Sequence, residues 1–387
     1  MQVIANRAEL LTLYKKAAKL ANNYSPIDAL KGVLMEADSS TNTLRLSSTN
    51  LEVSLRLTMS AEVHQSGGCV LDAKLGTDMF TLMGGDTVTM VLDNRNTLTI
   101  DCEHAHYGVI VLPAQTYPTM ELPYPEDSVQ ASGIPSMVKR TGFAAAGPDV
   151  MQCIHLVFSE HGMKAVGADG TRIMTSKGES KDGASVRMLI PAKSMAILAG
   201  LVADTDQLSV GTTGKLISFM TNNFIFTARL IHGNYIDTDL ILGNFQQQFM
   251  VLTDGVALWK LLDSAATVAK EGSTVGLTFT GSRITAQCET EDGSVEDSME
   301  VIPLRGEPKG TYYYGVKKLM QCLKAFDGSL QLEIGAGGIL LLSDQTTSCF
   351  HTAKRKPMPV ELAKPKIAEQ VEKPKKTRKK KELPLAA

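Results

Sequence analysis

Hydrophobic and polar residues follow two alternating patterns along this chain, and both patterns recur in the same order three times. Segments with apolar residues three or four positions apart, which is typical of a helix packed on a core, lie within residues 1–14, 128–143 and 249–262. Segments with every second residue apolar, which is typical of half-buried strands, lie within residues 97–112, 216–231 and 339–354. A repeat of this length predicts three tandem domains of the same kind.

Each copy contains a second predicted helix, which follows an apolar strand and begins beside a lysine: Lys74, Lys193 and Lys317. Between the helices the pattern is that of strands. Residues 44–57 form two predicted strands around a polar turn, and residues 87–100 form a predicted hairpin. We therefore expect α+β units, each with two helices on one side of an antiparallel sheet.

Breaks in the pattern divide the chain into expected domains of residues 1–123, 124–245 and 246–355. Pro123 and Pro125 interrupt both helix and strand at the first boundary, and the polar residues 243–248 mark the second. Proline and lysine dominate residues 356–387, which have few apolar side chains to bury. We expect this last segment to be a disordered basic tail.

The charge of the chain is divided in the same way. The 387 residues carry a net charge of −2, yet the segment from Lys354 onward has twelve basic and four acidic residues, so the preceding body is strongly acidic. No apolar run reaches the length of a membrane span, no signal peptide is visible, and the six cysteines are scattered. We expect a cytoplasmic protein with no membrane partner.

Against this acidic background, basic side chains collect on the predicted helices. Lys15, Lys16 and Lys19 share a polar face opposite Leu10 and Tyr14. Lysine is common on any solvated helix face, but recurrence in all three copies favours a surface that meets a polyanion. The residues expected on this surface are Lys15, Lys16, Lys19, Lys74, Lys139, Arg140, Lys193, Lys317 and Lys318.

Four segments resemble the bacterial sliding clamp family, the beta subunit of DNA polymerase III: residues 46–53, 112–118, 165–173 and 226–237. The third reads Ala-Val-Gly-Ala-Asp-Gly-Thr-Arg-Ile and is the most diagnostic. The resemblance implies a head-to-tail homodimer in which helices line a hole for double-stranded DNA. It also implies a non-catalytic protein without a cofactor, whose partners are the replicative DNA polymerase and the clamp loader.

Site residues follow from the same resemblance. The pocket that captures partner peptides is expected at Ile154, Gly170, Thr171, Arg172, Ile173, Gly243, His351, Thr352 and Ala353, and the dimer contact at Tyr107, Thr267 and Val268. The chain departs from the family in three places. Tyr24 stands where an arginine often contacts DNA, Gly243 replaces a proline, and the usually methionine-rich last strand is polar and continues into the tail.

The sequence offers little support for an enzyme. The chain lacks a phosphate-binding Gly-Lys-Ser/Thr loop and a Gly-x-Ser-x-Gly motif. Cys102, His104 and His106 alternate along one predicted strand face as a partial metal site, although an exposed strand edge with incidental histidines is the favoured interpretation and no metal is expected. The alternative function is a replication scaffold that does not encircle DNA and contacts it through the tail. The tail itself is either a solvated charge run or a non-specific DNA-binding segment, and its ending, residues 382–385, faintly resembles a clamp-binding peptide.

Overall fold

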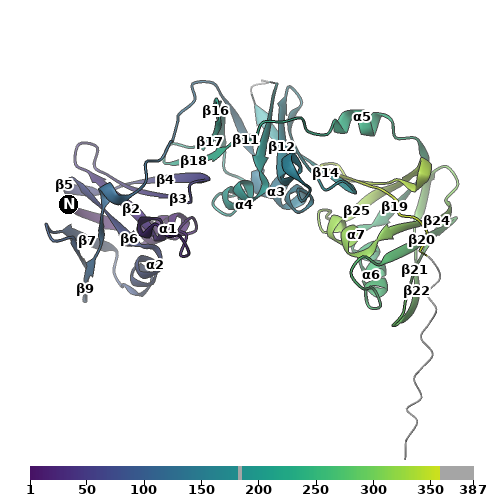
Figure 1. Ribbon diagram of the computed structural model, residues 1–387, viewed down its shortest axis with the longest axis horizontal. Coiled ribbons are helices and arrows are strands. Elements are labelled where there is room, and N and C mark those ends of the chain that lie inside the picture. Colours follow the sequence, from purple (N-terminus) through teal and green to yellow (C-terminus); the bar gives the residue numbers. More distant parts are fainter. Residues whose placement is uncertain (182–184, 358–387) are drawn as a thin grey trace, which may run out of the picture.

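The molecule is a curved arc of three modules, as the computed structural model in Figure 1 shows. The structure describes residues 1–181 and 185–357. Strands form the convex side of the arc, and the helices of all three modules lie along its concave side. None of the helices in these two ranges is long and apolar enough to cross a membrane. The predicted tail falls almost wholly outside the described residues.

The first module contains two antiparallel sheets and two helices. One sheet has the order β10–β6–β2–β3–β4 and consists of β2 (Gly32–Asp38), β3 (Thr43–Thr49), β4 (Val53–Ser60), β6 (Gly67–Asp72) and β10 (Leu112–Pro113). The other has the order β5–β1–β7–β8–β9 and consists of β1 (Gln2–Asn6), β5 (Glu62–Gln65), β7 (Thr87–Leu92), β8 (Thr97–Cys102) and β9 (Ala105–Ile110). The helices are α1 (Arg7–Ala18) and α2 (Ala73–Leu82).

The second and third modules repeat this plan. The second contains β11 (Ser128–Ser132), α3 (Ile134–Thr141), β12 (Cys153–Ser159), β13 (Gly162–Ala168), β14 (Arg172–Lys181), β15 (Val186–Pro191), α4 (Ala192–Ala199), β16 (Leu208–Thr213), β17 (Leu216–Met220) and β18 (Phe224–Arg229). The third contains β19 (Gln247–Asp254), α6 (Gly255–Ala266), β20 (Thr274–Thr280), β21 (Arg283–Thr290), β22 (Gly293–Glu300), β23 (Ile302–Arg305), β24 (Lys309–Gly315), α7 (Val316–Leu323), β25 (Ser329–Gly335), β26 (Leu340–Ser343) and β27 (Thr347–His351). A short helix that the sequence did not predict, α5 (Thr238–Gly243), connects them.

Three of the module helices, α1, α2 and α6, begin at a polar side chain that caps them. Asn6 accepts a hydrogen bond from the Glu9 amide at 3.0 Å, and Asp72 accepts from the Leu75 amide at 2.8 Å. Asp254 caps α6 in the same way, through the Ala257 amide. Such caps satisfy amide groups that have no partner within the helix. The α+β prediction is therefore confirmed, as are the strand pair at β3–β4 and the hairpin at β7–β8.

The two helices of the first module are joined through a buried tyrosine. Tyr14 of α1 is fully buried, and its hydroxyl lies 2.9 Å from the carbonyl oxygens of Leu71 and Asp72. Its ring meets Phe80 of α2 edge to face, with 5.1 Å between centroids. Gly76 makes this approach possible, because a Cβ atom there would lie 2.4 Å from the tyrosine hydroxyl. The helix pair is thus fixed to the sheet beneath it.

Neighbouring modules are joined edge to edge by strand pairing, so the sheets continue across both boundaries. We call these two boundaries seams. At the first seam β4 pairs antiparallel with β18, and Ser54 is opposite Thr227. At the second seam β14 pairs antiparallel with β27, and Ile173 is opposite Phe350. By the same plan, the strand equivalent to β4 and β14 in the third module is β22, and the strand equivalent to β18 and β27 in the first module is β9. These two strands are the free edges of the arc.

Candidate functional site

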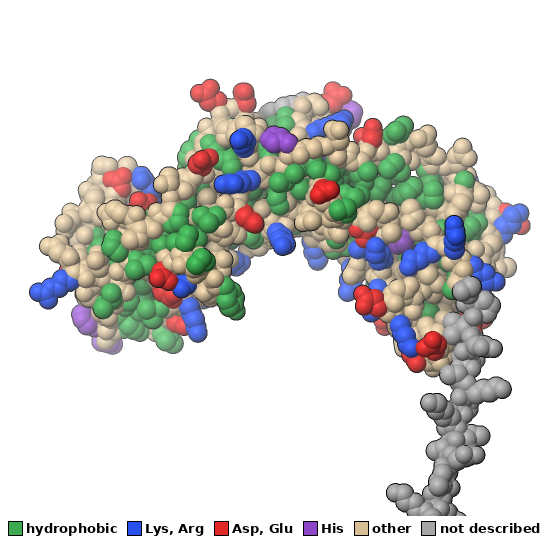
Figure 2. Space-filling model, in the orientation of Figure 1, with side chains coloured by type: hydrophobic (Ala, Val, Ile, Leu, Met, Phe, Trp, Pro, Cys, Tyr) green, Lys and Arg blue, Asp and Glu red, His purple; other side chains and the backbone are tan. Residues whose placement is uncertain are grey.

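The concave side of the arc carries basic side chains from every module. Figure 2 shows lysine and arginine along this inner edge, below the middle module and beside the third. Of the predicted polyanion-facing residues, those with exposed side chains on these helices are Lys15, Lys74, Lys139, Lys193 and Lys317. Lys16 is half-buried. Tyr24 follows α1 in an irregular loop and is 97% exposed, so nothing in the described chain covers its ring.

Three of the predicted cations also bridge modules, which the sequence did not reveal. Lys19 donates to the carbonyl oxygen of Gly200 at 2.6 Å, across the first seam. Arg140 donates to Thr346 at 2.8 Å and lies 3.2 Å from the carboxylate of Asp327, across the second seam. The third bridging cation is Lys318. These side chains hold the arc together, and their charge is partly committed to protein groups.

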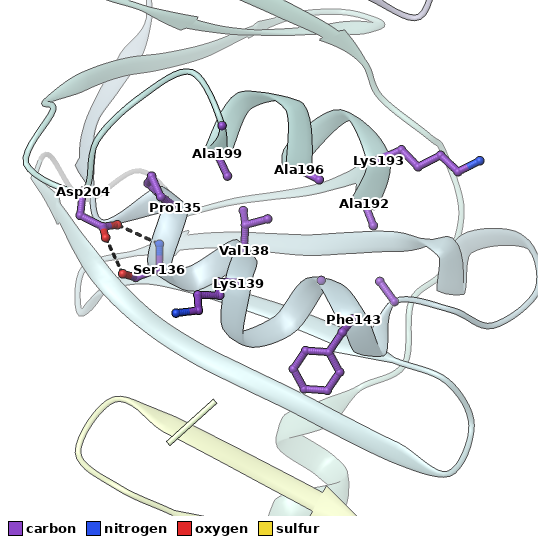
Figure 3. Close-up of a pocket in the computed structure, with 13 residues that line it drawn as sticks. Pro135, Ser136, Val138, Lys139, Phe143, Ala192, Lys193, Ala196, Ala199 and Asp204 are labelled. Carbon is purple, nitrogen blue, oxygen red and sulfur yellow. Dashed lines mark hydrogen bonds between the residues drawn. The ribbon is translucent and has the colours of Figure 1, made fainter. Parts of the chain in front are cut away.

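A groove lies between the two helices of the middle module, and Figure 3 shows its lining. Ala192, Ala196 and Ala199 of α4 form one wall, with Val138 and Lys139 of α3 opposite. The volume of the groove is about 750 Å³. At one end of the groove, Asp204 accepts from the amide of Ser136 at 2.8 Å and thereby satisfies the first turn of α3. The floor is small and apolar, and lysines stand at its rim.

The second seam contains a buried ionic network. Arg172 of β14 donates through Nε to Asp169 at 3.0 Å and through Nη1 to the carbonyl oxygen of Lys318 at 2.9 Å. The side chains of Arg172 and Asp169 are only 4% and 6% exposed. The guanidinium also lies 5.1 Å from the ring centroid of Phe143. The arginine therefore contacts both modules, and it has a structural role that the resemblance did not imply.

Asp169 is the anion that balances these cations. The Lys318 ammonium lies 3.0 Å from its carboxylate, and the Thr171 hydroxyl donates to it at 2.7 Å. Burial acts to raise the pKa of Asp169, but the hydrogen bonds from Thr171 and Lys318, together with the charge of Arg172, outweigh it and lower the pKa to about 2. The carboxylate is thus ionised at neutral pH and fixes the turn before β14.

His351 lies on the other side of the same seam, opposite Arg172 in the strand pairing. It is 1% exposed, and its ring meets Tyr314 edge to face at 5.7 Å. Nδ1 lies 2.9 Å from the carbonyl oxygen of Thr352, and Nε2 is buried with no hydrogen-bond partner among the described residues. Burial lowers the pKa of His351 to about 4. The imidazole is neutral above this pH, and protonating it would place a charge in the core of the seam.

The residues assigned to the partner pocket occupy three kinds of environment. Ile154, Arg172 and His351 are buried, Thr171, Ile173 and Ala353 are half-buried, and Gly170, Gly243 and Thr352 are exposed. The structure brings Thr171 and Thr352 together, because the amide of Thr352 donates to the carbonyl oxygen of Thr171 at 2.9 Å. Gly243 ends α5, where an added Cβ would contact nothing within 4 Å. Of the accessible members, Thr171, Ile173 and Thr352 therefore lie along the second seam.

The predicted dimer residues lie at the two free edges. Tyr107 is half-buried on β9, at one end of the arc. Thr267 and Val268 follow α6 at the other end, and the Thr290 hydroxyl donates to the carbonyl oxygen of Val268 at 2.9 Å, so they lie beside the turn that leads into β22. The two sets are far apart in one chain and can meet only between copies.

The prediction that Cys102, His104 and His106 share one strand face is wrong. Cys102 ends β8, His104 lies in the turn, and His106 is on β9. The Cys102 thiol donates to the backbone carbonyls of Gly84 and Thr87 and is buried. A hairpin turn was missed because its residues, Glu103 and His104, are not the usual turn formers. Within the two described ranges, no group of three or more His, Cys, Asp or Glu side chains is arranged to hold a metal ion.

The fold and these surfaces define a segment of a ring built from repeated modules, with basic helices inside and sheets outside. Family models of the DNA polymerase III beta subunit match residues 1–121, by the N-terminal domain, and residues 128–237, by the central domain. Together they match more than half of the chain, which therefore belongs to the DNA polymerase III beta subunit family of sliding clamps.

Individual relatives agree with this assignment. The beta sliding clamp of Synechocystis is 25% identical over 375 residues, which cover 87% of this chain and 94% of the relative. That of Synechococcus elongatus is 22% identical over 361 residues, covering 88% and 95%. Among solved structures, the DNA polymerase sliding clamp of Bacillus subtilis has a TM-score of 0.83 at 18% identity, and the beta subunit of Streptococcus pyogenes has a TM-score of 0.85 at 18%. Each covers 92% of this chain and 100% of the solved chain, so the fold extends over all three modules.

Proposed function

We propose that this protein is a DNA sliding clamp, a non-catalytic processivity factor that encircles duplex DNA as a ring-shaped homodimer. The observation that carries the proposal is the repeated seam. At each junction within the chain, the edge strand β4 or β14 of one module pairs with the edge strand β18 or β27 of another. The equivalent strands β22 of the third module and β9 of the first remain unpaired on their outer edges among the described residues. Two copies placed head to tail satisfy both free edges at once and close the ring without a new kind of contact.

DNA would pass through the hole and meet the basic helix faces. Contacts between lysine and phosphate carry no sequence information and are weakened by salt, which suits a protein that must slide. The exposed cations Lys15, Lys74, Lys139, Lys193 and Lys317 are the proposed DNA-facing set. Tyr24 and the half-buried Lys16 would lie at its margin, and the bridging cations Lys19, Arg140 and Lys318 would support it. Retention would come from topological linkage rather than from affinity.

Partners would dock on the outside. We propose that short peptides of the replicative polymerase and the clamp loader bind where the second seam reaches the surface, against the accessible pocket residues Gly170, Thr171, Ile173, Gly243, Thr352 and Ala353. Arg172, His351 and Ile154 would form the buried support behind them. The domain boundaries proposed above, after residues 123, 245 and 355, place this pocket between the second and third domains. Action on DNA inside the cell implies a cytoplasmic location.

The test is retention on DNA of different topology. Protein loaded by a clamp loader onto nicked circular duplex should co-elute with the DNA on gel filtration and should be lost after the circle is cut. Equal retention on circular and linear duplex would contradict encirclement and would favour a scaffold that binds DNA through its basic tail. Solution mass at micromolar concentration should be that of a dimer.

A charge-reversal pair tests the inner surface. Lys139→Glu together with Lys193→Glu should shorten the lifetime on circular DNA and reduce polymerase stimulation, since both side chains are exposed at the groove of Figure 3. The matched control is Lys215→Glu, an exposed lysine in the turn between β16 and β17. Equal effects of the pair and the control would remove the inner groove from the DNA surface.

A further inference from the structure

The two seams of this chain share one register, and that register can be transferred to the free edges. Each strand that pairs at a seam, and each of the two free edge strands, is preceded by a four-residue turn. On one side the turns are 50–53 and 169–172, before β4 and β14, and the matching turn before β22 is 290–293. On the other side the turns are 221–224 and 344–347, at β18 and β27, and the matching turn at β9 is 102–105.

Counted from these turns, the same positions face each other at both seams. The second residue after each turn pairs Leu55 with Phe226 at the first seam and Met174 with Cys349 at the second, and all four are fully buried. The last bond of each ladder also matches, because the Thr58 amide donates to Asn223 and the Lys177 amide donates to Thr346, at 2.9 and 2.8 Å. Two independent junctions thus give one rule.

Applied to the free edges, the rule fixes which residues meet between copies. Val295 of β22 would stand opposite Tyr107 of β9, and both are half-buried apolar residues in the single chain. This pair corresponds to the buried pairs of the two seams. At the next pair, one residue further along β22 and one residue nearer the turn along β9, Glu296 would stand opposite His106. At the equivalent position of the second seam, the Thr175 and Ser348 hydroxyls are 2.6 Å apart, so side chains at this position do touch.

Carboxylates stand on both sides of this imidazole in the proposed junction. On β22 and in the turn before it, the acidic residues are Glu291, Asp292, Glu296, Asp297 and Glu300. On β9 the imidazole of His106 already contacts the Asp101 carboxylate of β8, its cross-strand neighbour, and Glu103 and His104 occupy the adjoining turn. In the joined sheet His106 would lie between Asp101 and Glu296, with Ser294 and Ser298 diagonal to it on the same face. A cation between two carboxylates is stabilising, whereas a neutral ring there leaves the two acids facing each other.

We propose that the ring closes in this register, with His106 of one copy opposite Glu296 of the other, so that gain of a proton by this imidazole tightens the ring. The inference rests on the proposed function, since it needs a second copy of this chain at the free edges. Histidine is the side chain that changes charge between about pH 5 and 8. Ring closure would therefore be stronger in mildly acidic solution than in mildly basic solution, and opening would be easier as the pH rises.

A charge swap tests the register by analytical ultracentrifugation. His106→Glu should raise the dimer dissociation constant about tenfold, because it places like charges across the interface. Adding Glu296→Lys should return the constant to within about threefold of the native value. The control His64→Glu changes an exposed histidine on β5 and should leave dimerisation unchanged. A melting curve for each variant checks that the modules are folded.

The pH dependence is the second measurement. Between pH 8 and pH 6 the native dimer should tighten about three- to tenfold, and His106→Gln should lose most of that change. Failure of Glu296→Lys to rescue His106→Glu in a protein that still dimerises would overturn the register, since a slip of two residues puts Ser294 or Ser298 opposite His106. A native protein that stays monomeric at all pH values would instead refute the proposed ring itself.

Discussion

Replacing Arg172 with methionine should loosen the second seam more than any exposed substitution. The guanidinium is buried between modules, bonded to Asp169 and to the backbone of Lys318, and stacked on Phe143. Methionine keeps much of the volume but leaves the Asp169 carboxylate buried beside a single ammonium. Breaking one partner of a buried ion pair costs about 3–5 kcal/mol. The fall in the pKa of Asp169 from 3.8 to about 2 corresponds to about 2–3 kcal/mol of stabilisation of the carboxylate. We therefore expect a loss of about 3 kcal/mol.

The single tryptophan provides the assay. Trp259 is half-buried on α6 and packs against the core of the third module, so its fluorescence reports that module. Guanidinium unfolding of native protein and Arg172→Met should differ in midpoint, compared as one transition because a three-module chain need not unfold in two states. Arg95→Met, at an exposed turn, is the matched control. A loss below about 1 kcal/mol, equal to that of the control, would refute the structural role of Arg172.

Three further outcomes are expected. Tyr14→Phe should lower the free energy of unfolding of the first module by about 1–2 kcal/mol, measured by denaturant titration, because buried carbonyl groups lose their hydroxyl donor. The stability of the second seam should fall as the pH drops from about 6.5 to 4, because the imidazole of His351 gains a proton in the unfolded chain but stays neutral when buried. The total loss should be about 3 kcal/mol, and His351→Gln should remove this pH dependence in a series of melting curves. Truncation after Ala363 should weaken low-salt affinity for duplex and flatten its salt dependence, while dimer mass is unchanged; an unchanged salt slope would show that the tail does not bind DNA.

The sequence predicted the repeat and the helix pairs because those features are local. The apolar stripe through Leu10 and Tyr14 and the caps at Asn6 and Asp72 are readable within a few residues. The strand pairing between modules was not predicted, because β4 and β18 are more than 160 residues apart and alternation does not name a partner.

The candidate site was predictable only in outline for the same reason. The resemblance singled out Arg172 as a pocket residue, but its partners Lys318 and Phe143 come from distant segments. A buried salt bridge of this kind leaves one local signal, the Asp-Gly-Thr-Arg turn, in which Asp169 can cap its own loop. Which lysines are free and which bridge modules depends on the curvature of the arc, and neither composition nor periodicity encodes it.

Because the sheets run unbroken through both seams, the curvature of the arc belongs to the single chain before any second copy arrives. Three modules on flexible linkers would have to be ordered each time the ring closed, and that entropy would be subtracted from the closing contacts. In the proposed ring the two chains would meet already bent, so less of the contact free energy of their edge strands would be offset by ordering. If one interface of that ring opened, each chain would move away as one continuous arc, because its modules share their sheets.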